Sequence, residues 1–270
     1  MTDTSSRRPV FRSAVGDFIR VARETPKDVS IVFIVAAVLN ILSYYIGSRR
    51  FFRGIFFSSL GADPHYMLYE YLYWFAAEFV CSFLLPLSAI LILHRSRPAA
   101  FGLKTGDREF GFKIVGLFVA VMIPVCWVAS DQPGFAAVYP HAQLVKGDWS
   151  LFLVYEAFFL LYFFGWEFIW RGYVLFGLEK HLGAGPAVLV QMLPFVILHN
   201  GKPVLETFGA IIGAIALGAL ALRTRSFLYC FATHWTVMFF MDLFSTLRER
   251  TQAHGLGFDA LTRIVTGLFP

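Results

Sequence analysis

Long apolar segments separated by short polar ones make up most of this chain. Seven of these segments are long enough and apolar enough to be helices in a bilayer. They cover residues 29–46, 66–94, 112–129, 151–178, 184–199, 204–222 and 227–247. The pattern therefore predicts an all-α fold, a polytopic membrane helix bundle with about seven transmembrane helices.

Two stretches outside these segments combine apolar and basic residues. In residues 1–27, apolar side chains recur at helical spacing with arginines between them: Phe11, Arg12, Val15, Phe18, Ile19, Arg20 and Arg23. This pattern indicates an amphipathic helix lying on an anionic membrane face, and a disordered basic tail is the alternative. Arginines and phenylalanines in residues 49–57 predict a second surface segment. The polar and basic start also argues against a cleavable signal peptide.

The distribution of lysine and arginine predicts how the bundle is oriented. With the N-terminus inside, 14 of the 23 basic residues fall in inside stretches and eight in outside stretches. An excess of basic residues marks the cytoplasmic side. We therefore expect a multi-pass protein, in a bacterial inner membrane, with a cytoplasmic N-terminus. Arg49, Arg50 and Arg53 are the main exceptions.

Composition agrees with the membrane assignment and excludes other classes. The chain is 57% hydrophobic and 15% charged, whereas soluble domains carry about 25% charged residues. The net charge of +5 comes from residues between apolar segments, which argues against nucleic acid as a partner and for the lipid bilayer. The three cysteines lie in apolar segments without metal-site spacing, so they are expected to be small buried side chains.

One charged pair stands out within the fourth segment. Glu167 and Arg171 are four residues apart, so they lie on the same face of a helix, with the acid in the favourable N-terminal position. Ionisable residues at membrane depth are costly unless paired, and they are functional candidates by default. Glu70 and Glu78 in the second segment are instead expected to mark a polar face that lines a cavity or an interfacial helix end.

Two histidines could join this pair. His199 ends the fifth segment and His234 lies in the last one. At 1.5 Å per residue, the depths from the inside face are roughly 18 Å for Glu167, 23 Å for His199 and 12 Å for His234. Helix tilt can close this spread, so the four side chains are predicted to meet near mid-membrane.

These residues, in this order, resemble the CPBP (Abi) family of intramembrane CAAX-type prenyl endopeptidases and their bacterial relatives. The family pattern is Glu-Glu-xxx-Arg, then Phe-xxx-His, then His-xxx-Asn or Asp, and the resemblance covers about residues 150–245. It implies that Glu167 is the second motif glutamate, Arg171 the motif arginine, and His199 and His234 the motif histidines. It further implies that glutamate and the first histidine activate a water, while the third motif polarises the scissile carbonyl.

Two positions depart from the family pattern. Trp166 stands where the first glutamate is expected, and tryptophan cannot accept a proton. Met238 stands four residues after His234, in place of Asn or Asp. Asp242, one turn further along the same helix, could replace that polar group in a shifted geometry.

The departures leave the general base open. Glu167 is the first candidate, although its pairing with Arg171 would make it a weaker base. Glu156 faces the same way but lies about 16 Å away along the helix. Glu206 could fold back towards His199. Alternatively, a glutamate and two histidines could hold a catalytic zinc with an open position.

The expected function is an intramembrane endopeptidase of the CAAX/CPBP type, acting on a membrane-associated or C-terminally anchored peptide or protein. Residues 1–148 would form an N-terminal amphipathic helix and three transmembrane helices, residues 149–247 a catalytic four-helix core, and residues 248–270 a tail. The alternative is a nonproteolytic immunity or scaffold protein of the same fold, as Trp166 and Met238 suggest. A transporter would need paired broken helices, and the sequence shows no such pairing.

Overall fold

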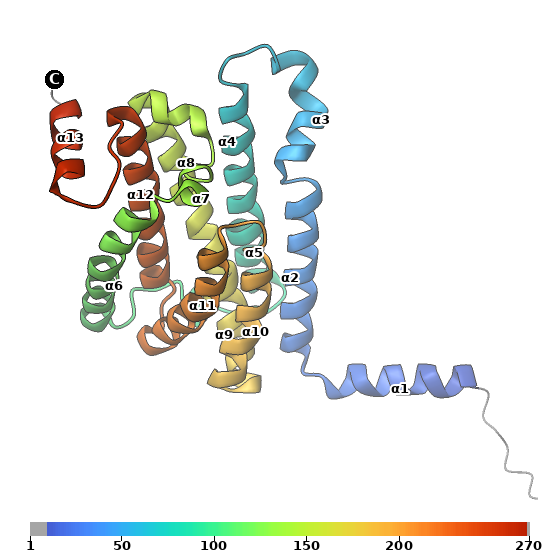
Figure 1. Ribbon diagram of the computed structural model, residues 1–270. Coiled ribbons are helices and arrows are strands. Elements are labelled where there is room, and N and C mark those ends of the chain that lie inside the picture. The colour runs from blue at the N-terminus through green and yellow to red at the C-terminus, as the bar shows by residue number, and fades with distance from the viewer. Residues whose placement is uncertain (1–9, 269–270) are drawn as a thin grey trace, which may run out of the picture.

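A computed structural model describes residues 10–268, whose regular elements are all helices, with no strand among them. The predicted all-α class is therefore confirmed for this part of the chain (Figure 1). The α-helices are α1 (Val10–Glu24), α2 (Lys27–Tyr45), α3 (Arg49–Leu60), α4 (Tyr66–Phe79), α5 (Leu85–Ile92), α6 (Arg108–Ala129), α7 (Pro133–Ala136), α8 (Trp149–Glu167), α9 (Leu175–Leu182), α10 (Ala184–Ile197), α11 (Val204–Thr224), α12 (Leu228–Thr251) and α13 (Phe258–Leu268). Two 3₁₀ turns, η2 (Pro98–Phe101) and η3 (Gln143–Gly147), lie in the connections.

Two of the long helices contain a π-helical turn in their middle. The turn η1 (Val80–Leu84) joins α4 to α5, and η4 (Phe168–Val174) joins α8 to α9. A π turn holds an extra residue, and such turns are frequent at functional sites. Each run continues as one rod, over residues 66–92 and 149–182.

Five helical runs of the described chain are long and apolar enough to cross a membrane. They are Lys27–Leu60, Tyr66–Ile92, Arg108–Ala129, Trp149–Leu182 and Val204–Thr224. This is the architecture of a multi-pass membrane protein. The other two predicted segments are helices that are not both long and apolar enough to count as spans. The helix α10 is short, with 14 residues, and α12 carries His234, Asp242 and two arginines.

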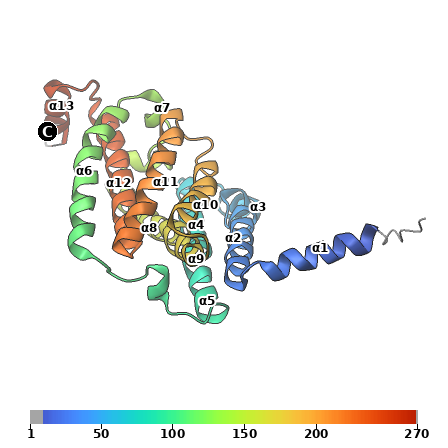
Figure 2. The same ribbon diagram turned by 90° about the horizontal axis from the view of Figure 1, so that it is seen from below.

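The long helix α8–α9 lies at the centre of the bundle. It packs against α4 on one side and α12 on the other, and α6 covers α12 (Figure 2). The α10–α11 hairpin packs against α9 and η4, and its turn lies well below the upper ends of α4 and α12 in Figure 1. At about 1.5 Å per residue, α10 is only about 21 Å long, so the hairpin turn lies partway along the bundle.

The helix α1 points away from the bundle and does not continue the direction of α2 (Figures 1 and 2). Its apolar side chains Val15, Phe18 and Ile19 are exposed, which suits a helix lying on a membrane surface. Residues 1–9 and the side chains of Phe11 and Arg12 lie outside the part of the chain whose details are described.

One expectation needs correction. The helix α3 does not form a separate surface segment; it continues in line with α2 (Figure 1). Buried Glu70 on α4 pairs with Arg49 at 3.2 Å and Arg53 at 3.3 Å and so holds α3 beside α4. In α11, Gly209 and Gly213 face open space, whereas Gly218 packs against α10. Residues 248–270, the expected tail, include the helix α13.

Candidate active site

A buried ion pair lies where α8 passes into the π turn η4. Arg171 Nη1 donates to Glu167 Oε1 at 3.0 Å, and both side chains are 0% exposed. The guanidinium carbon also lies 4.0 Å from the centre of the Phe195 ring, a cation–π contact from α10. The predicted pairing along the helix is therefore present, and the fifth segment covers it.

The last long helix brings His234 onto the same carboxylate. His234 Nδ1 lies 2.6 Å from Glu167 Oε1. Since a carboxylate accepts, this nitrogen carries the proton, and the other ring nitrogen, Nε2, keeps its lone pair in the neutral ring. The carboxylate thus fixes both the tautomer and the orientation of the imidazole.

His199 lies just beyond the end of α10, in the hairpin turn. Its Nδ1 lies 2.7 Å from the carbonyl oxygen of Phe195, one turn back. The same tautomer argument leaves Nε2 of His199 with a free lone pair. The hydroxyl of Thr207 on α11 donates to the His199 carbonyl oxygen at 3.1 Å and fixes the turn. The Phe195 ring lies between the two imidazoles, with centroids 4.5 Å from His199 and 6.0 Å from His234.

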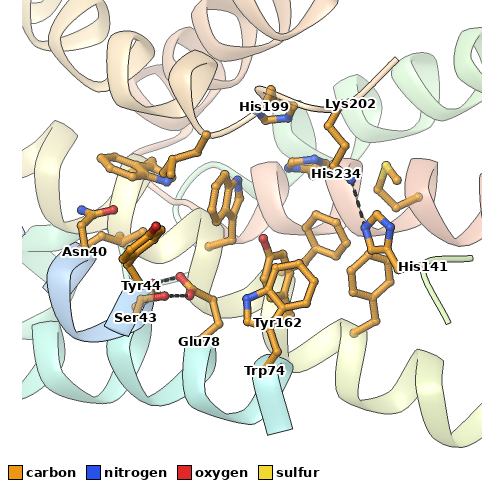
Figure 3. Close-up of a pocket in the computed structure, with 18 of the residues that line it drawn as sticks. Asn40, Ser43, Tyr44, Trp74, Glu78, His141, Tyr162, His199, Lys202 and His234 are labelled. Atoms are coloured by element: carbon orange, nitrogen blue, oxygen red, sulfur yellow. Dashed lines mark hydrogen bonds between the residues drawn. The ribbon is translucent and has the colours of Figure 1, made fainter. Parts of the chain in front are cut away.

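Both imidazoles line one cavity of about 250 Å³ between α2, α4, α8, α12 and the hairpin turn (Figure 3). Polar groups from five regions of the chain share this cavity, whose lining includes Asn40, Ser43, Glu78, His141, His199, Lys202, Glu206 and His234. Aromatic rings fill much of the wall between them. Glu167 and Arg171 are absent from the wall, so the ion pair lies behind His234.

The two departures from the motif both face the cavity. Trp166 is 8% exposed and lines the wall, with its ring 6.2 Å from the His199 ring. Met238 also lines it. Tryptophan and methionine leave this part of the wall without a proton acceptor.

The other candidate bases are placed elsewhere or already bonded. Glu156 and Asp242 are buried and face each other between α8 and α12, and neither lines the cavity. Asp242 therefore does not replace the polar group missing at Met238. Glu206 does reach the cavity, where it accepts a hydrogen bond from the Tyr139 hydroxyl at 2.5 Å.

A second polar cluster at this end of the cavity comes from loops. Lys202 Nζ lies 2.8 Å from the Tyr139 hydroxyl and 3.0 Å from His141 Nε2. Burial, together with the Lys202 ammonium, holds the pKa of His141 well below its usual value, so this ring is a neutral acceptor. Burial also lowers the pKa of Lys202. Sequence reasoning missed Tyr139 and His141, because loop residues carry no helical periodicity that would place them.

The geometry does not fit a zinc site made from the expected ligands. A catalytic zinc needs about three protein ligands, but Glu167 Oε1 is already held by Arg171 and His234 Nδ1. Within residues 10–268, no three histidine, cysteine, aspartate or glutamate side chains are grouped to hold a metal ion. The imidazole nitrogens that face the cavity are better described as proton acceptors.

Comparison with known proteins gives one match. Residues 148–240 match the family model described as type II CAAX prenyl endopeptidase Rce1-like. This range includes the ion pair and both cavity histidines. Searches of curated proteins and of solved structures found no match.

Proposed function

Because residues 148–240 form a domain of the Rce1-like type II CAAX prenyl endopeptidase family, we propose that this protein is an intramembrane endopeptidase. Its substrate is a peptide or protein anchored in or near the membrane, close to its C-terminus. The observation that carries the proposal is the pair of imidazoles on one cavity, each oriented through a hydrogen bond from Nδ1 to an oxygen and each without a hydrogen-bond partner at Nε2 in the described part of the chain.

In the proposed reaction His234 is the general base. Its Nε2 takes a proton from a water in the cavity, the water oxygen bonds to the scissile carbonyl carbon, and Glu167 stabilises the imidazolium that forms. The proton then passes to the leaving amine as the C–N bond breaks. His199 Nε2 lies on the same cavity and accepts the second hydrogen bond that orients the water.

Glu167 acts through His234 in this scheme and is a positioning residue. One of its oxygens, Oε1, already accepts hydrogen bonds from Arg171 and His234, and the side chain is 0% exposed. A general base must come within about 2.6–3.2 Å of the proton that it takes, directly or through one water. A group behind the cavity wall does not meet that requirement.

The proposal is tested with purified full-length protein and a library of internally quenched peptides, half of them carrying an S-farnesylcysteine near the C-terminus. His199→Ala and His234→Ala are expected to abolish cleavage, and Glu156→Gln, a buried carboxyl off the cavity, is the matched control. Full cleavage by both histidine variants would overturn the proposal.

A nonproteolytic immunity or scaffold role is the second candidate, supported by Trp166 and Met238 on the cavity wall. Trp166→Glu distinguishes the two. If the wild type is inactive, this change creates or raises peptidase activity. If the wild type is a working enzyme that uses tryptophan, the same change lowers its activity.

We also propose a topology for this domain in the membrane. The basic ends of α5, α9 and α11 lie on the same side of the bundle as α1 (Figure 1), which supports a cytoplasmic N-terminus in a bacterial inner membrane. In this arrangement residues 149–247 form the catalytic core, behind an N-terminal part of residues 1–148, and residues 248–270 follow it. Reporter fusions after residues 105 and 254 are expected to map to the inside and the outside, respectively.

A further inference from the structure

A buried carboxylate forms the wall of the cavity across from the histidines. Glu78 on α4 is 6% exposed and lines the cavity. Its Oε1 accepts a hydrogen bond from Ser82 in η1 at 2.5 Å, and its Oε2 accepts one from Ser43 on α2. Figure 3 shows Glu78 and Ser43 together on one side, with His199, His234 and Lys202 on the other. The carboxylate is therefore fixed by two helices and faces open space.

Of the two acidic side chains that line the cavity, Glu78 and Glu206, only Glu206 has a cation beside it in the described part of the chain. Glu70, two turns earlier on α4, pairs with Arg49 and Arg53, and Glu167 pairs with Arg171. No lysine, arginine or histidine nitrogen lies within 4.0 Å of Glu78 in the described part of the chain. Hydroxyl donors favour the charged form, but burial opposes it until a cation is near.

The cationic end of the cavity does not supply this missing charge. Lys202 lines the opposite side, where it lies 3.9 Å from Glu206 and bonds to Tyr139 and His141. Its charge already has an acidic neighbour. The acidic side chain on the cavity wall that is left without a basic partner is thus Glu78.

Aromatic rings surround the same space. The cavity lining includes Tyr44, Trp74, Tyr162, Trp166 and Trp170, and Tyr162 stacks on Trp166 with centroids 5.7 Å apart. The faces of tyrosine and tryptophan rings attract organic cations, most strongly when water is excluded. A carboxylate together with such rings is the chemistry that recognises an ammonium or guanidinium group.

We propose that the Glu78 end of the cavity is a binding site for an organic cation, the ammonium or guanidinium group of a basic side chain. If the chain is a peptidase, as proposed above, this site selects substrates that carry a lysine or arginine near the cleaved bond. The cation is held by the Glu78 carboxylate and the surrounding rings while the peptide bond lies towards the histidines.

A role for Glu78 as the general base is less consistent with the geometry. Both of its oxygens already accept a hydrogen bond from a serine, and it lies across the cavity from both imidazoles (Figure 3). A base would alter the rate of the chemical step, whereas a cation site alters binding. The two roles are therefore separable by experiment.

Binding is measured first, without any substrate. Full-length protein in nonionic detergent is titrated with n-pentylammonium chloride, and with pentan-1-ol as the neutral probe, by following tryptophan fluorescence. The wild type is expected to bind the ammonium saturably, Glu78→Gln roughly tenfold more weakly or worse, and Glu156→Gln like the wild type. Equal ammonium binding by Glu78→Gln, or equal binding of pentan-1-ol and pentylammonium by the wild type, overturns the proposal.

Two further measurements distinguish loss of the cation site from misfolding of the variant and from failure of the peptidase proposal. If Glu78→Gln does not fold, as judged by thermal unfolding, Ser43→Ala and Glu78→Asp displace the carboxylate and are expected to weaken ammonium binding as well. Where cleavage is found, exchanging lysine for norleucine in the peptide raises KM for the wild type but not for Glu78→Gln. A lower kcat in Glu78→Gln with unchanged ammonium binding overturns the cation site. If no peptide is cleaved at all, the peptidase proposal fails, but the ammonium titration still tests the cation site.

Discussion

His234 and Glu167 are 67 residues apart in the chain and belong to different helices, yet His234 Nδ1 lies 2.6 Å from Glu167 Oε1. The same oxygen accepts a hydrogen bond from Arg171 at 3.0 Å. The carboxylate therefore neutralises a buried guanidinium and orients an imidazole at the same time. Its replacement should affect both reactivity and stability, and these effects can be measured separately.

Glu167→Gln is expected to lower peptide cleavage by about 10²–10⁴-fold. The amide keeps the size of the side chain, but it cannot stabilise a positive charge on His234. The rate is measured with the internally quenched peptides at saturating concentration, and Glu156→Gln serves as the control. Cleavage within twofold of the wild type would show that His234 does not depend on this carboxylate.

Arg171→Met is expected to destabilise the protein by about 3–5 kcal/mol, because it leaves a buried carboxylate without its cation. Adding Glu167→Gln should recover part of this loss, since the double variant has no unpaired charge. The stability of each variant is measured by thermal unfolding in detergent. Strict additivity of the two single effects would contradict the buried ion pair.

Gly165→Ala is expected to destabilise the contact between α8 and α4. The added Cβ would lie 3.2 Å from Phe79 Cα and 3.3 Å from the Glu78 carbonyl oxygen, and backbone atoms there cannot easily move. Overpacking of this kind costs about 1–3 kcal/mol. Gly213→Ala on α11 is the matched control, because it has nothing within 4 Å of the added atom, and alanine favours helices by about 0.5–1 kcal/mol. Equal unfolding temperatures for the two variants would contradict the close approach.

Asp148→Ala is expected to lower the unfolding temperature, because Asp148 caps α8. Its carboxylate accepts from the backbone nitrogens of Ser150 at 2.6 Å and Leu151 at 3.2 Å. These hydrogen bonds, that from Leu151 first, lower the pKa of Asp148 below its ordinary value of 3.8. The stabilisation is therefore complete above that value and is lost as the pH falls through the lowered pKa. Unfolding midpoints at pH 7 and pH 3 should show the difference from wild type shrinking at the lower pH.

Periodicity and the cost of charge in a membrane were enough to predict the all-α class and to single out Glu167 and Arg171 as candidates. Glu167 and Arg171 could be placed on one helix face because four residues make about one turn. The estimated depths of the two histidines differed by about 11 Å, yet their rings line one cavity. Tilted helices and a hairpin turn partway along the bundle close that gap, and neither can be read from the sequence alone.

Which acid reaches the cavity could not be predicted. Glu156 faces the same way as Glu167 along the helix, but it lies buried near Asp242 and does not line the cavity. For Glu78 the sequence predicts a polar face that lines a cavity or an interfacial helix end, and Glu78 does line the cavity, at the level where Gly165 lets α4 approach α8. Contacts between helices determine where these acids lie. Such contacts depend on small residues such as Gly165, whose neighbours across the interface are distant in the chain.

The π turn over residues 168–174 sets the rotational phase between the two ends of a 34-residue rod. This turn holds one more residue than an α-helical stretch of the same rotation, so removing one residue from it would restore the ordinary helical pitch and leave the direction of α9 unchanged. Gly177, which meets Val32 and Phe101 closely, would then keep these neighbours. A single-residue deletion is therefore expected to be tolerated better within this turn than in the α-helical parts of the rod, where it would rotate everything beyond it by about 100°.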